Sequence, residues 1–410
     1  CQEYTTGFYN AYYFIADEDV DFVVHLGDYI YEALNEPFFQ SDKVRDFSLP
    51  SGLSYAYYLE DYRKIYEVYK SDPYLQKVHE KFPFFHVWDD HEFSNDCFGA
   101  NAPDNGVEIA GSIFQPERRK WANKAFWEYI PGEFYFDETK DDPAEQIKLY
   151  RNFRFGNLAE LIITDERLYR SGHICGEGRA PGDRYLAEYN SKKCKNPEEQ
   201  TMLGKEQLNW FLERLADAEN SEIIWKMHAN EVYMMQIKIS EGKKLEGTKF
   251  YLFDQWDGFP AEREKILRFI ADNRIKNYFV ITGDLHTYVV GELHKDFFNP
   301  SPTPEGVEFV GTSITSLSTS GIFQKMFGWS YNEAKKWEEE NILKYNKHIK
   351  FFDAFHHGYT KVVINPEEAV VELWAVSTIK EPPEKSEKFL LKKYRVRKNT
   401  NKIEDITPEQ

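Results

Sequence analysis

Two kinds of hydrophobic pattern alternate along the chain. Short runs rich in β-branched and aromatic residues predict strands, and stretches in which apolar residues recur every three to four positions predict helices. The strand-like runs span residues 21–28, 82–90, 158–168, 222–230, 277–286, 307–316 and, as a late pair, 360–376. The helix-like stretches span residues 55–71, 117–130, 204–220 and 260–274. Strands that alternate with helices in this order predict an α/β domain.

The sequence contains neither an internal repeat nor a low-complexity linker that would divide this domain. One main domain over residues 1–379 is therefore the simplest prediction. From Lys380 on the chain becomes charged and irregular, which predicts a tail or an edge segment over residues 380–410.

Polar side chains follow several predicted strands at the point where each strand ends. Asp28, Asp90, Asn230 and the pair Asp284 and His286 each come after four or more mostly apolar residues. In open α/β sheets the carboxyl ends of the strands meet at one crevice, where ligands bind. We therefore expect these side chains to converge on a single site.

The most acidic of these strand ends is Asp89-Asp90-His91-Glu92. Adjacent ionisable groups at the end of a buried strand repel and desolvate one another, so solvent or cations must compensate them. The stretch is either a solvated acidic turn or a metal site. His91 also has two interpretations, because a histidine beside acids is commonly a surface or structural residue with a raised pKa. In a metal site it would instead stabilise the transition state or protonate the leaving oxygen.

Neighbouring side chains indicate the kind of metal. Tyr31 follows Asp28 by three residues, and a phenolate forms at neutral pH only beside a strong Lewis acid. Tyr31 as a ligand would therefore imply a ferric-type ion. Asp284 and His286 alternate with Leu285, so both can face the same way. Because carboxylates suit hard cations whereas imidazole suits transition metals, the sequence predicts a mixed site.

The charge of the chain narrows the range of functions. A formal net charge of −18 over 410 residues argues against a nucleic-acid binder, whose footprint would be basic. An anionic substrate would then need local positive charge, which bound metal provides. No apolar run approaches the roughly 20 residues of a membrane span, and no signal peptide is visible.

The cysteines leave two questions open. The sequence begins at Cys1 without a methionine, so the chain is expected to be either processed or part of a longer one. Cys175 and Cys194 bracket a polar, glycine-rich loop. They would form a disulfide in an exported protein, or are two unrelated thiols.

Seven segments resemble, in this order, the blocks of the PhoD-like alkaline phosphatase and phosphodiesterase family, a branch of the calcineurin-like metallophosphoesterases. They are HLGDYIYE, VWDDHEFSND, FRFGNLAELIITDERLYR, TMLGKEQLNWF, DQWDGFPAER, VITGDLHT and EFVGTSITS. The resemblance extends from Cys1 to about Val376, and several blocks in order are more specific than any single one. It implies a metallophosphoesterase-type layered sandwich with two central β-sheets flanked by helices, and makes residues 1–379 a catalytic domain.

The resemblance also implies roles for the motif residues. Asp28 corresponds to a ligand that bridges two metals, Tyr31 to a ligand of ferric iron, and His91 to the catalytic histidine. The further ligands that it implies are Asp90, Asp284 and His286. Asn95 is expected to bind calcium or a phosphate oxygen. Arg167 is expected to bind a phosphate oxygen or to pair with acids in the core.

Two ligand positions remain open. The family's first block carries a cysteine ligand that corresponds to Cys1, although an N-terminal cysteine after processing can also be a lipidated residue. The family's amino-terminal segment and first core strand, which precede this cysteine, are not in this sequence, so we expect a truncated chain or a sheet that lacks a strand. For the middle ligand, Asn230 is the first candidate and His228 the second.

The activity that the resemblance implies is hydrolysis of phosphate monoesters or diesters in the alkaline range, with Fe³⁺ and Ca²⁺ or other divalent cations. A water held by two cations would attack phosphorus in line while His91 assists the leaving group. The alternatives are a phospholipase D-like phosphodiesterase that uses the same site and a non-catalytic, calcium-stabilised binding protein. The resemblance further implies an exported, periplasmic or extracellular enzyme of phosphate acquisition that acts as a monomer on small phosphate esters.

Overall fold

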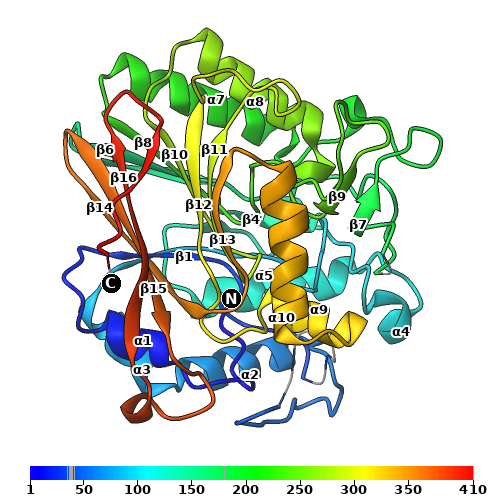
Figure 1. Cartoon of the computed structure of the whole chain (residues 1–410). Helices are drawn as coiled ribbons and strands as arrows, with labels where there is room; N and C mark the ends of the chain where they lie inside the picture. Colours follow the sequence, from blue (N-terminus) through cyan, green and yellow to red (C-terminus); the bar gives the residue numbers. More distant parts are fainter. Residues whose placement is uncertain (35, 37–39, 41, 180, 410) are drawn as a thin grey trace.

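A seven-stranded sheet with the order β13-β11-β12-β10-β8-β6-β5 forms the centre of the molecule in the computed structural model, which describes residues 1–34, 36, 40, 42–179 and 181–409 (Figure 1). The four middle strands run parallel, whereas β11, β13 and β5 are antiparallel to their neighbours. The strands are β5 (Arg151–Phe155), β6 (Ala159–Ile163), β8 (Trp225–Asn230), β10 (Tyr278–Thr282), β11 (Tyr288–Leu293), β12 (Gly306–Val310) and β13 (Ile349–Asp353).

Successive residues of the middle strands face two separate hydrophobic cores, because side chains alternate across a strand. In β6, Leu161 and Ile163 belong to one core and Ile162 to the other. Helices α7 (Gly204–Asn220) and α8 (Pro260–Asp272) cover the face on the side of Ile162 (Figure 1). Helix α8 begins at a proline, whose fixed φ and missing N–H suit the first helical turn.

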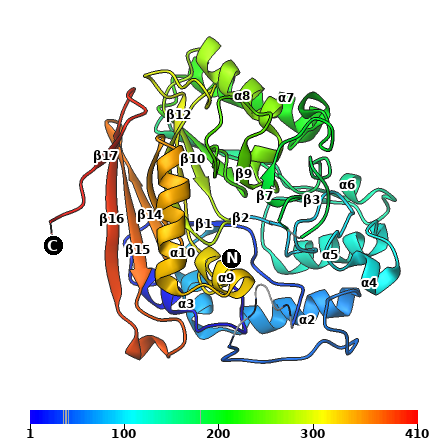
Figure 2. The same cartoon turned by 45° about the vertical axis from the view of Figure 1, so that its right-hand side comes forward.

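A second layer covers the opposite face of the large sheet. It contains a four-stranded antiparallel sheet of the order β14-β15-β16-β17 and a parallel pair, β1 and β2. Val371 and Leu373 of β15 share one core with Leu161 of the large sheet. These strands are β1 (Val23–Leu26), β2 (Phe84–Val87), β14 (His357–Ile364), β15 (Glu368–Val376), β16 (Lys388–Arg397) and β17 (Ile403–Asp405). Figure 2 shows the four-stranded sheet, orange to red, at one side of the molecule.

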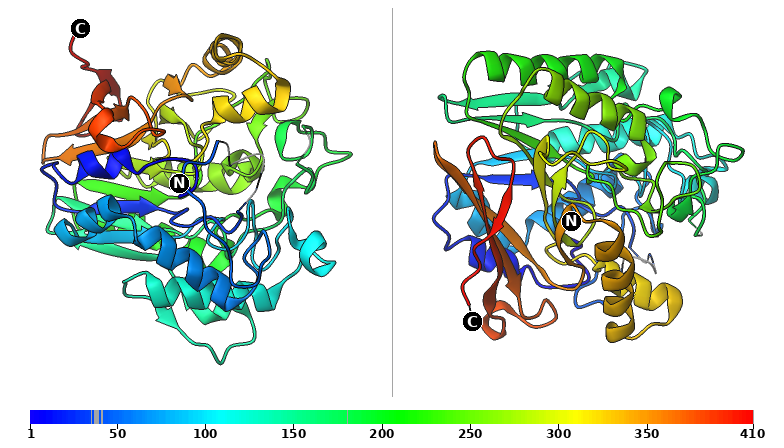
Figure 3. Two further views of the ribbon diagram at one scale, coloured as in Figure 1. Left: turned by 90° about the horizontal axis from the view of Figure 1, so that it is seen from below. Right: turned by 45° about the horizontal axis from the view of Figure 1, so that its top comes forward.

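The first and last parts of the chain lie side by side (Figure 3). The side chain of Asn10 in α1 (Asn10–Ile15) donates a hydrogen bond of 2.7 Å to the carbonyl of Thr378. The same layer holds α2 (Leu59–Lys70), α3 (Pro73–Lys81) and α5 (Pro116–Tyr129). The remaining elements are β3 (Tyr135–Phe136), β4 (Ile147–Lys148), β7 (Tyr185–Glu188), β9 (Lys249–Leu252), α4 (Gly106–Ala110), α6 (Pro143–Gln146), α9 (Thr319–Phe327) and α10 (Tyr331–Glu338), with short helical turns at Pro197–Glu199, Trp256–Gly258, Glu339–Leu343 and Pro383–Lys385.

Each of the predicted strand regions contains a strand, and the four predicted helices correspond to α2, α5, α7 and α8. Residues 388–405 contain strands β16 and β17, which pair with β15 and with each other at one end of the four-stranded sheet, so of the two predicted alternatives they agree with the edge segment. Alternating side chains explain why this charged segment forms a strand, since Tyr394 and Val396 of β16 are buried while their charged neighbours face solvent. A boundary of the catalytic domain at residue 379 stays a prediction. Among the residues described, no helix is both long and apolar enough to cross a membrane.

Candidate metal centre

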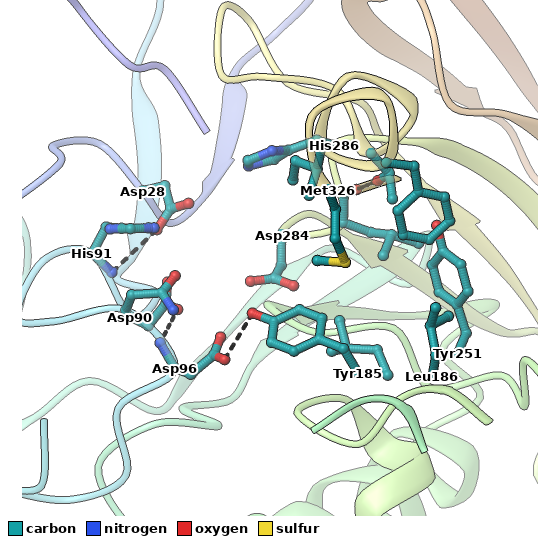
Figure 4. A pocket seen from close by; sticks show the side chains of 16 residues that line it. Asp28, Asp90, His91, Asp96, Tyr185, Leu186, Tyr251, Asp284, His286 and Met326 are labelled. Carbon is teal, nitrogen blue, oxygen red and sulfur yellow. Dashed lines mark hydrogen bonds between the residues drawn. The ribbon is translucent and has the colours of Figure 1, made fainter. Parts of the chain in front are cut away.

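Three strands deliver carboxylates to one place. Asp28 follows β1 and Asp90 follows β2, and these strands pair in parallel with Leu26 opposite Val87. Asp284 follows β10 of the large sheet. Figure 4 shows Asp28, Asp90 and Asp284 around the same cavity, with His91 and His286 beside them. The convergence that the strand ends predict is therefore present.

The turns after these strands have an unusual backbone conformation. Asp28, Asp284 and His286 have positive φ angles of 50°, 59° and 54°. Gly27 has a φ of 98°, and a Cβ added there would lie 2.3 Å from the Cβ of Asp89. Only glycine permits this close approach of the two loops, so Gly27 sets the position of Asp28 beside the acidic stretch.

One group of side chains combines sulfur, oxygen and nitrogen donors. Ligand atoms of Cys1, Asp28 and His286 all lie within 4.8 Å of one another. The Tyr31 hydroxyl donates to Asp28 Oδ2 at 2.8 Å and lies 3.1 Å from His286 Nε2. Thiolate, phenolate and imidazole are donors suited to a ferric or other transition-metal ion, so the donor set fits the expected iron.

Hydrogen bonds hold these donors in position. The backbone of Cys1 donates to the Gly27 carbonyl at 3.2 Å and accepts from the N–H of Ile314 at 2.9 Å. Burial lowers the pKa of His286 to about 3, so the ring is neutral. Its Nδ1 lies 2.7 Å from the Leu317 carbonyl and must carry the proton, which leaves the Nε2 lone pair directed at the centre.

A second set of donors consists mainly of carboxylates. Ligand atoms within 4.8 Å of one another join Asp28, Asp90 and His91, and likewise Asp89, Asp90 and Asp284. Asp28 thus belongs to two groups, and Asp90 also belongs to two. Asp89 Oδ2 and Asp90 Oδ1 are buried and accept no hydrogen bond from any described residue. Buried carboxylate oxygens without a donor are costly unless a cation compensates them, so these residues fit a hard cation.

The electrostatics of the buried acids also indicate that a cation must compensate them. Burial raises the pKa of Asp28 well above its usual range, Asp90 and Glu92 add to this, and His91 opposes it. The main positive partner of the acids is Arg167, which is fully buried. Its guanidinium contacts Asp89 at 2.5 Å, Asp254 at 2.8 Å and Asp284 at 3.0 Å. One guanidinium cannot neutralise all of these carboxylates, and bound cations would reduce the remaining repulsion.

His91 lies at the edge of the cavity on top of Tyr31, with ring centroids 4.0 Å apart. Its Nδ1 is 2.6 Å from Glu32 Oε2. Burial alone would lower the pKa of His91, but Glu32, Asp90 and Asp28 outweigh it and raise the pKa well above its usual range. The imidazole is therefore held protonated, with Glu32 fixing its orientation, as a proton donor requires.

Asn95 and Arg167, the two other expected residues, differ in their position relative to the cavity. Asn95 lines the cavity, and its backbone N–H donates to Glu32 at 3.0 Å. Arg167 does not line the cavity, because its nitrogens face carboxylates of the protein, so the geometry supports the pairing with core acids that was its alternative role. A direct contact of Arg167 with substrate stays a prediction.

Asn230 and His228 do not line the cavity, and a ligand role for Asn230 stays a prediction. The Asn230 amide oxygen accepts from the Trp256 indole at 3.0 Å, and its nitrogen donates to the Val232 carbonyl. His228 lies between the hydroxyls of Thr164 and Tyr278, each at 2.7 Å. Both side chains are thus occupied in fixing the packing at the end of β8, away from the cavity.

Several residues of the site were not predicted from the sequence. Glu32 holds His91, and ligand atoms of Asp96, His173 and Asp254 form a further group within 4.8 Å of one another. The remaining side chains around the cavity of about 70 Å³ are mainly apolar and come from β7, β9 and α9. Cys175 and Cys194 form a disulfide, which resolves the question left open by the sequence.

Comparison with known proteins gives concordant matches. The model of the PhoD-like phosphatase family matches residues 1–373. Alkaline phosphatase D of Bacillus subtilis (strain 168) is 32% identical over 383 residues, which are 93% of this chain and 59% of that protein. The chain thus spans about three fifths of the length of this relative.

Solved structures are also similar. A structure of PhoD matches with a TM-score of 0.80 and 28% identity, over 100% of this chain and 70% of that one. The match to a purple acid phosphatase from yellow lupin (Lupinus luteus) seeds is weaker, with a TM-score of 0.44 and 12% identity over 95% of this chain and 49% of that one.

Proposed function

Because the chain belongs to the PhoD-like phosphatase family, we propose that it is a metal-dependent hydrolase of phosphate monoesters or diesters. The observation that best supports this activity is the position of Asp28 in two groups of ligand atoms, each within 4.8 Å. A carboxylate shared by two neighbouring cation positions is what a two-metal hydrolysis of phosphate esters requires.

The donor sets distinguish the two positions. Cys1, Tyr31 and His286 would hold Fe³⁺, because thiolate, phenolate and imidazole bind a transition metal. Asp90 and Asp284 would hold Ca²⁺ or another divalent cation, because calcium prefers oxygen ligands. Asp28 would serve both positions. When bound, the cations would supply a nucleophilic water at neutral pH and stabilise negative charge on the phosphate oxygens.

The side chains of the protein would protonate the leaving group, contact the phosphate and orient the acids. His91 donates its proton to the oxygen of the departing alcohol, and Glu32 keeps its Nδ1 engaged so that Nε2 is the donating atom. Asn95 lines the cavity and contributes a polar contact to the phosphate or a cation. Arg167 holds Asp89, Asp254 and Asp284 in fixed orientations without lining the cavity itself.

The setting of this activity is part of the proposal. The Cys175–Cys194 disulfide supports a periplasmic or extracellular location, because disulfides persist in oxidising compartments. The seven-stranded sheet and the strands β1, β2 and β14 to β17 would be the two central sheets of a metallophosphoesterase sandwich. The substrates would be small phosphate esters, hydrolysed by a monomer.

Hydrolysis of 4-nitrophenyl phosphate and bis(4-nitrophenyl) phosphate tests the function. We expect turnover that needs calcium and is reduced by more than about 100-fold in Asp28→Asn, since a shared ligand is lost. Asp72→Asn is the matched control, because Asp72 is a buried carboxylate that caps α3 and asparagine caps equally well. The faster substrate decides between monoesterase and diesterase, and hence tests the phospholipase D-like alternative.

The metal assignment can be tested separately, by visible absorption and metal content. We expect the iron-loaded protein to have a visible tyrosinate-to-iron absorption band that Tyr31→Phe removes while the calcium content stays unchanged. If neither nitrophenyl ester is hydrolysed by the iron- and calcium-loaded protein, and Asp28→Asn leaves both metal contents unchanged, the protein is a calcium-stabilised binding protein and the proposal is wrong.

A further inference from the structure

The cavity has two chemically different sides (Figure 4). Asp28, Asp90, Asp284 and His286 lie on one side. Leu186 of β7, Tyr251 of β9 and Met326 of α9 lie on the opposite side, where Tyr185 directs its hydroxyl to Asp96 (Figure 4). Together with Leu252, Ile322 and Phe323 of β9 and α9, which also line the cavity, these three residues form what we name the apolar wall. A phosphate ester has the same division, with a polar phosphate and an organic group.

One residue of the apolar wall sits in an unfavourable backbone conformation. Leu186 has a φ of 47°, in the left-handed region where a bulky side chain is strained. The strand pairing continues on either side of it, since Tyr185 faces Leu252 and Ala187 faces Phe250 across β9. A glycine or asparagine would relieve this strain. A leucine that lines the cavity in spite of it indicates that its side chain has a use there.

The rest of the chain fixes the apolar wall in place. The Cys175–Cys194 disulfide encloses the segment with Tyr185 and Leu186. The ring of Phe323 contacts Tyr251 and Trp337, with centroids 5.6 and 5.3 Å apart. A surface held on two sides in this way is preformed before substrate binds, which limits the entropy lost on binding.

Packing alone does not account for the whole wall. Tyr251 and Phe323 are buried and serve the core, but Leu186, Ile322 and Met326 remain partly exposed and line the cavity. Next to them Phe327 is 37% exposed, so the apolar surface continues outward from the cavity. An alkyl or aryl group would remove this surface from water, whereas a glycerol, sugar or nucleoside would lose hydrogen bonds with water there.

We propose that the apolar wall makes the site selective for phosphate esters whose organic group is apolar, with Leu186, Ile322 and Met326 as the residues that determine this specificity. This selectivity rests on the proposed function, because the phosphate must bind at the metal side for the organic group to reach the wall.

Hydrolysis of ethyl, butyl and hexyl phosphate tests the selectivity. Their leaving alcohols have nearly the same acidity, so differences in kcat/KM report contacts of the chain and not reactivity of the ester. We expect kcat/KM to rise roughly two- to fourfold for each methylene group that leaves water, until the wall is covered. We expect a higher kcat/KM for propyl phosphate than for glycerol 1-phosphate. Phenyl phosphate shows whether aromatic groups are accepted as well as alkyl chains.

The variants Leu186→Gly and Met326→Ser should bring the ratio of kcat/KM for hexyl phosphate to kcat/KM for ethyl phosphate close to one. Leu186→Gly also suits the positive φ at this position, and urea unfolding of the variant checks that a loss of selectivity does not result from unfolding. Phe389→Ser is the control, because Phe389 is an apolar residue, 37% exposed, that does not line the cavity.

Binding of ethyl, butyl and hexyl phosphonate, measured by calorimetry, separates the two proposals because it needs no turnover. Affinity that rises with chain length in a protein that hydrolyses no ester would sustain the apolar wall and reject the hydrolase function. Hydrolysis of all three esters at equal kcat/KM would reject the selectivity and leave the function intact. Absence of both hydrolysis and binding would reject both.

Discussion

Replacing His86 by phenylalanine should make the protein more stable, and increasingly so as the pH falls. His86 lies in β2 and is 2% exposed, and neither ring nitrogen has a hydrogen-bond partner among the residues described. Its ring is 5.6 Å from that of His25, its partner in β1, and 5.8 Å from that of His79. It also stacks on Phe84 at 5.2 Å, so a second phenylalanine suits the position.

The pH dependence follows from the pKa of this histidine. Burial lowers the pKa of His86 well below its usual value, and the charges of His79, Lys70 and Arg151 add to this. Below pH 6.5 the unfolded chain takes up a proton at this residue that the folded protein does not take up. The free energy of unfolding therefore falls with decreasing pH, by about 1.4 kcal/mol per pH unit for one such group.

These quantities give a magnitude at each pH. Between pH 6.5 and pH 5, His86 costs the wild type about 2 kcal/mol. Above pH 7.5 the titration contributes nothing, but two buried nitrogens without partners still cost about 1 kcal/mol or more. We expect His86→Phe to raise the free energy of unfolding by about 1 kcal/mol at pH 8 and by about 3 kcal/mol at pH 5.

Urea unfolding followed by tryptophan fluorescence at pH 8, 7, 6 and 5 measures this difference. Comparing variant with wild type at each pH cancels the contributions of carboxylates and metals. His356→Gln is the control, because the hydrogen bond with Asp353 raises the pKa of His356 against the effect of burial. Its stabilisation is present at low pH and lost as the pH rises through the raised pKa, so the trend is opposite. A gain for His86→Phe that is equal at all four pH values would refute the reasoning.

Two further changes test the supports of the centre. Gly27→Ala places a Cβ 2.3 Å from that of Asp89 and should reduce phosphate ester hydrolysis about 100-fold together with metal content, whereas Gly52→Ala, also at positive φ but with open space around it, should only lower stability by about 1 kcal/mol. Replacing Cys175 and Cys194 by alanine opens a loop with a sequence separation of 19 and should lower the free energy of unfolding by about 3 kcal/mol, measured by chemical unfolding against wild type with and without reductant.

The features that the sequence predicts well are those encoded locally. Strands and long helices have periodic patterns, and Asp28, Asp90 and Asp284 follow strands of two different sheets whose carboxyl ends meet at one cavity. The direction of a side chain at a strand end is not local, because it depends on what packs nearby. Asn230 follows the same rule as the aspartates, yet its amide is used by Trp256, whose position no pattern in the sequence gives.

Charged side chains in the core present the same difficulty. The pattern around Arg167 shows a cation near acids, but not whether its nitrogens face a substrate or the protein. The structure brings Asp89, Asp254 and Asp284 to it from three distant segments. Such a network is long-range, so a single sequence gives its members without their pairing.

The two sides of the cavity come from different parts of the fold, and this difference has a consequence for specificity. The ligands come from strand ends, whose positions the large sheet and the β1–β2 pair fix together. The apolar wall comes from β7, β9 and α9, which lie in connections between those strands. Connections can change while the scaffold stays the same. Substitutions in the wall should therefore alter the preferred organic group and leave metal binding intact, whereas substitutions at the strand ends should remove both.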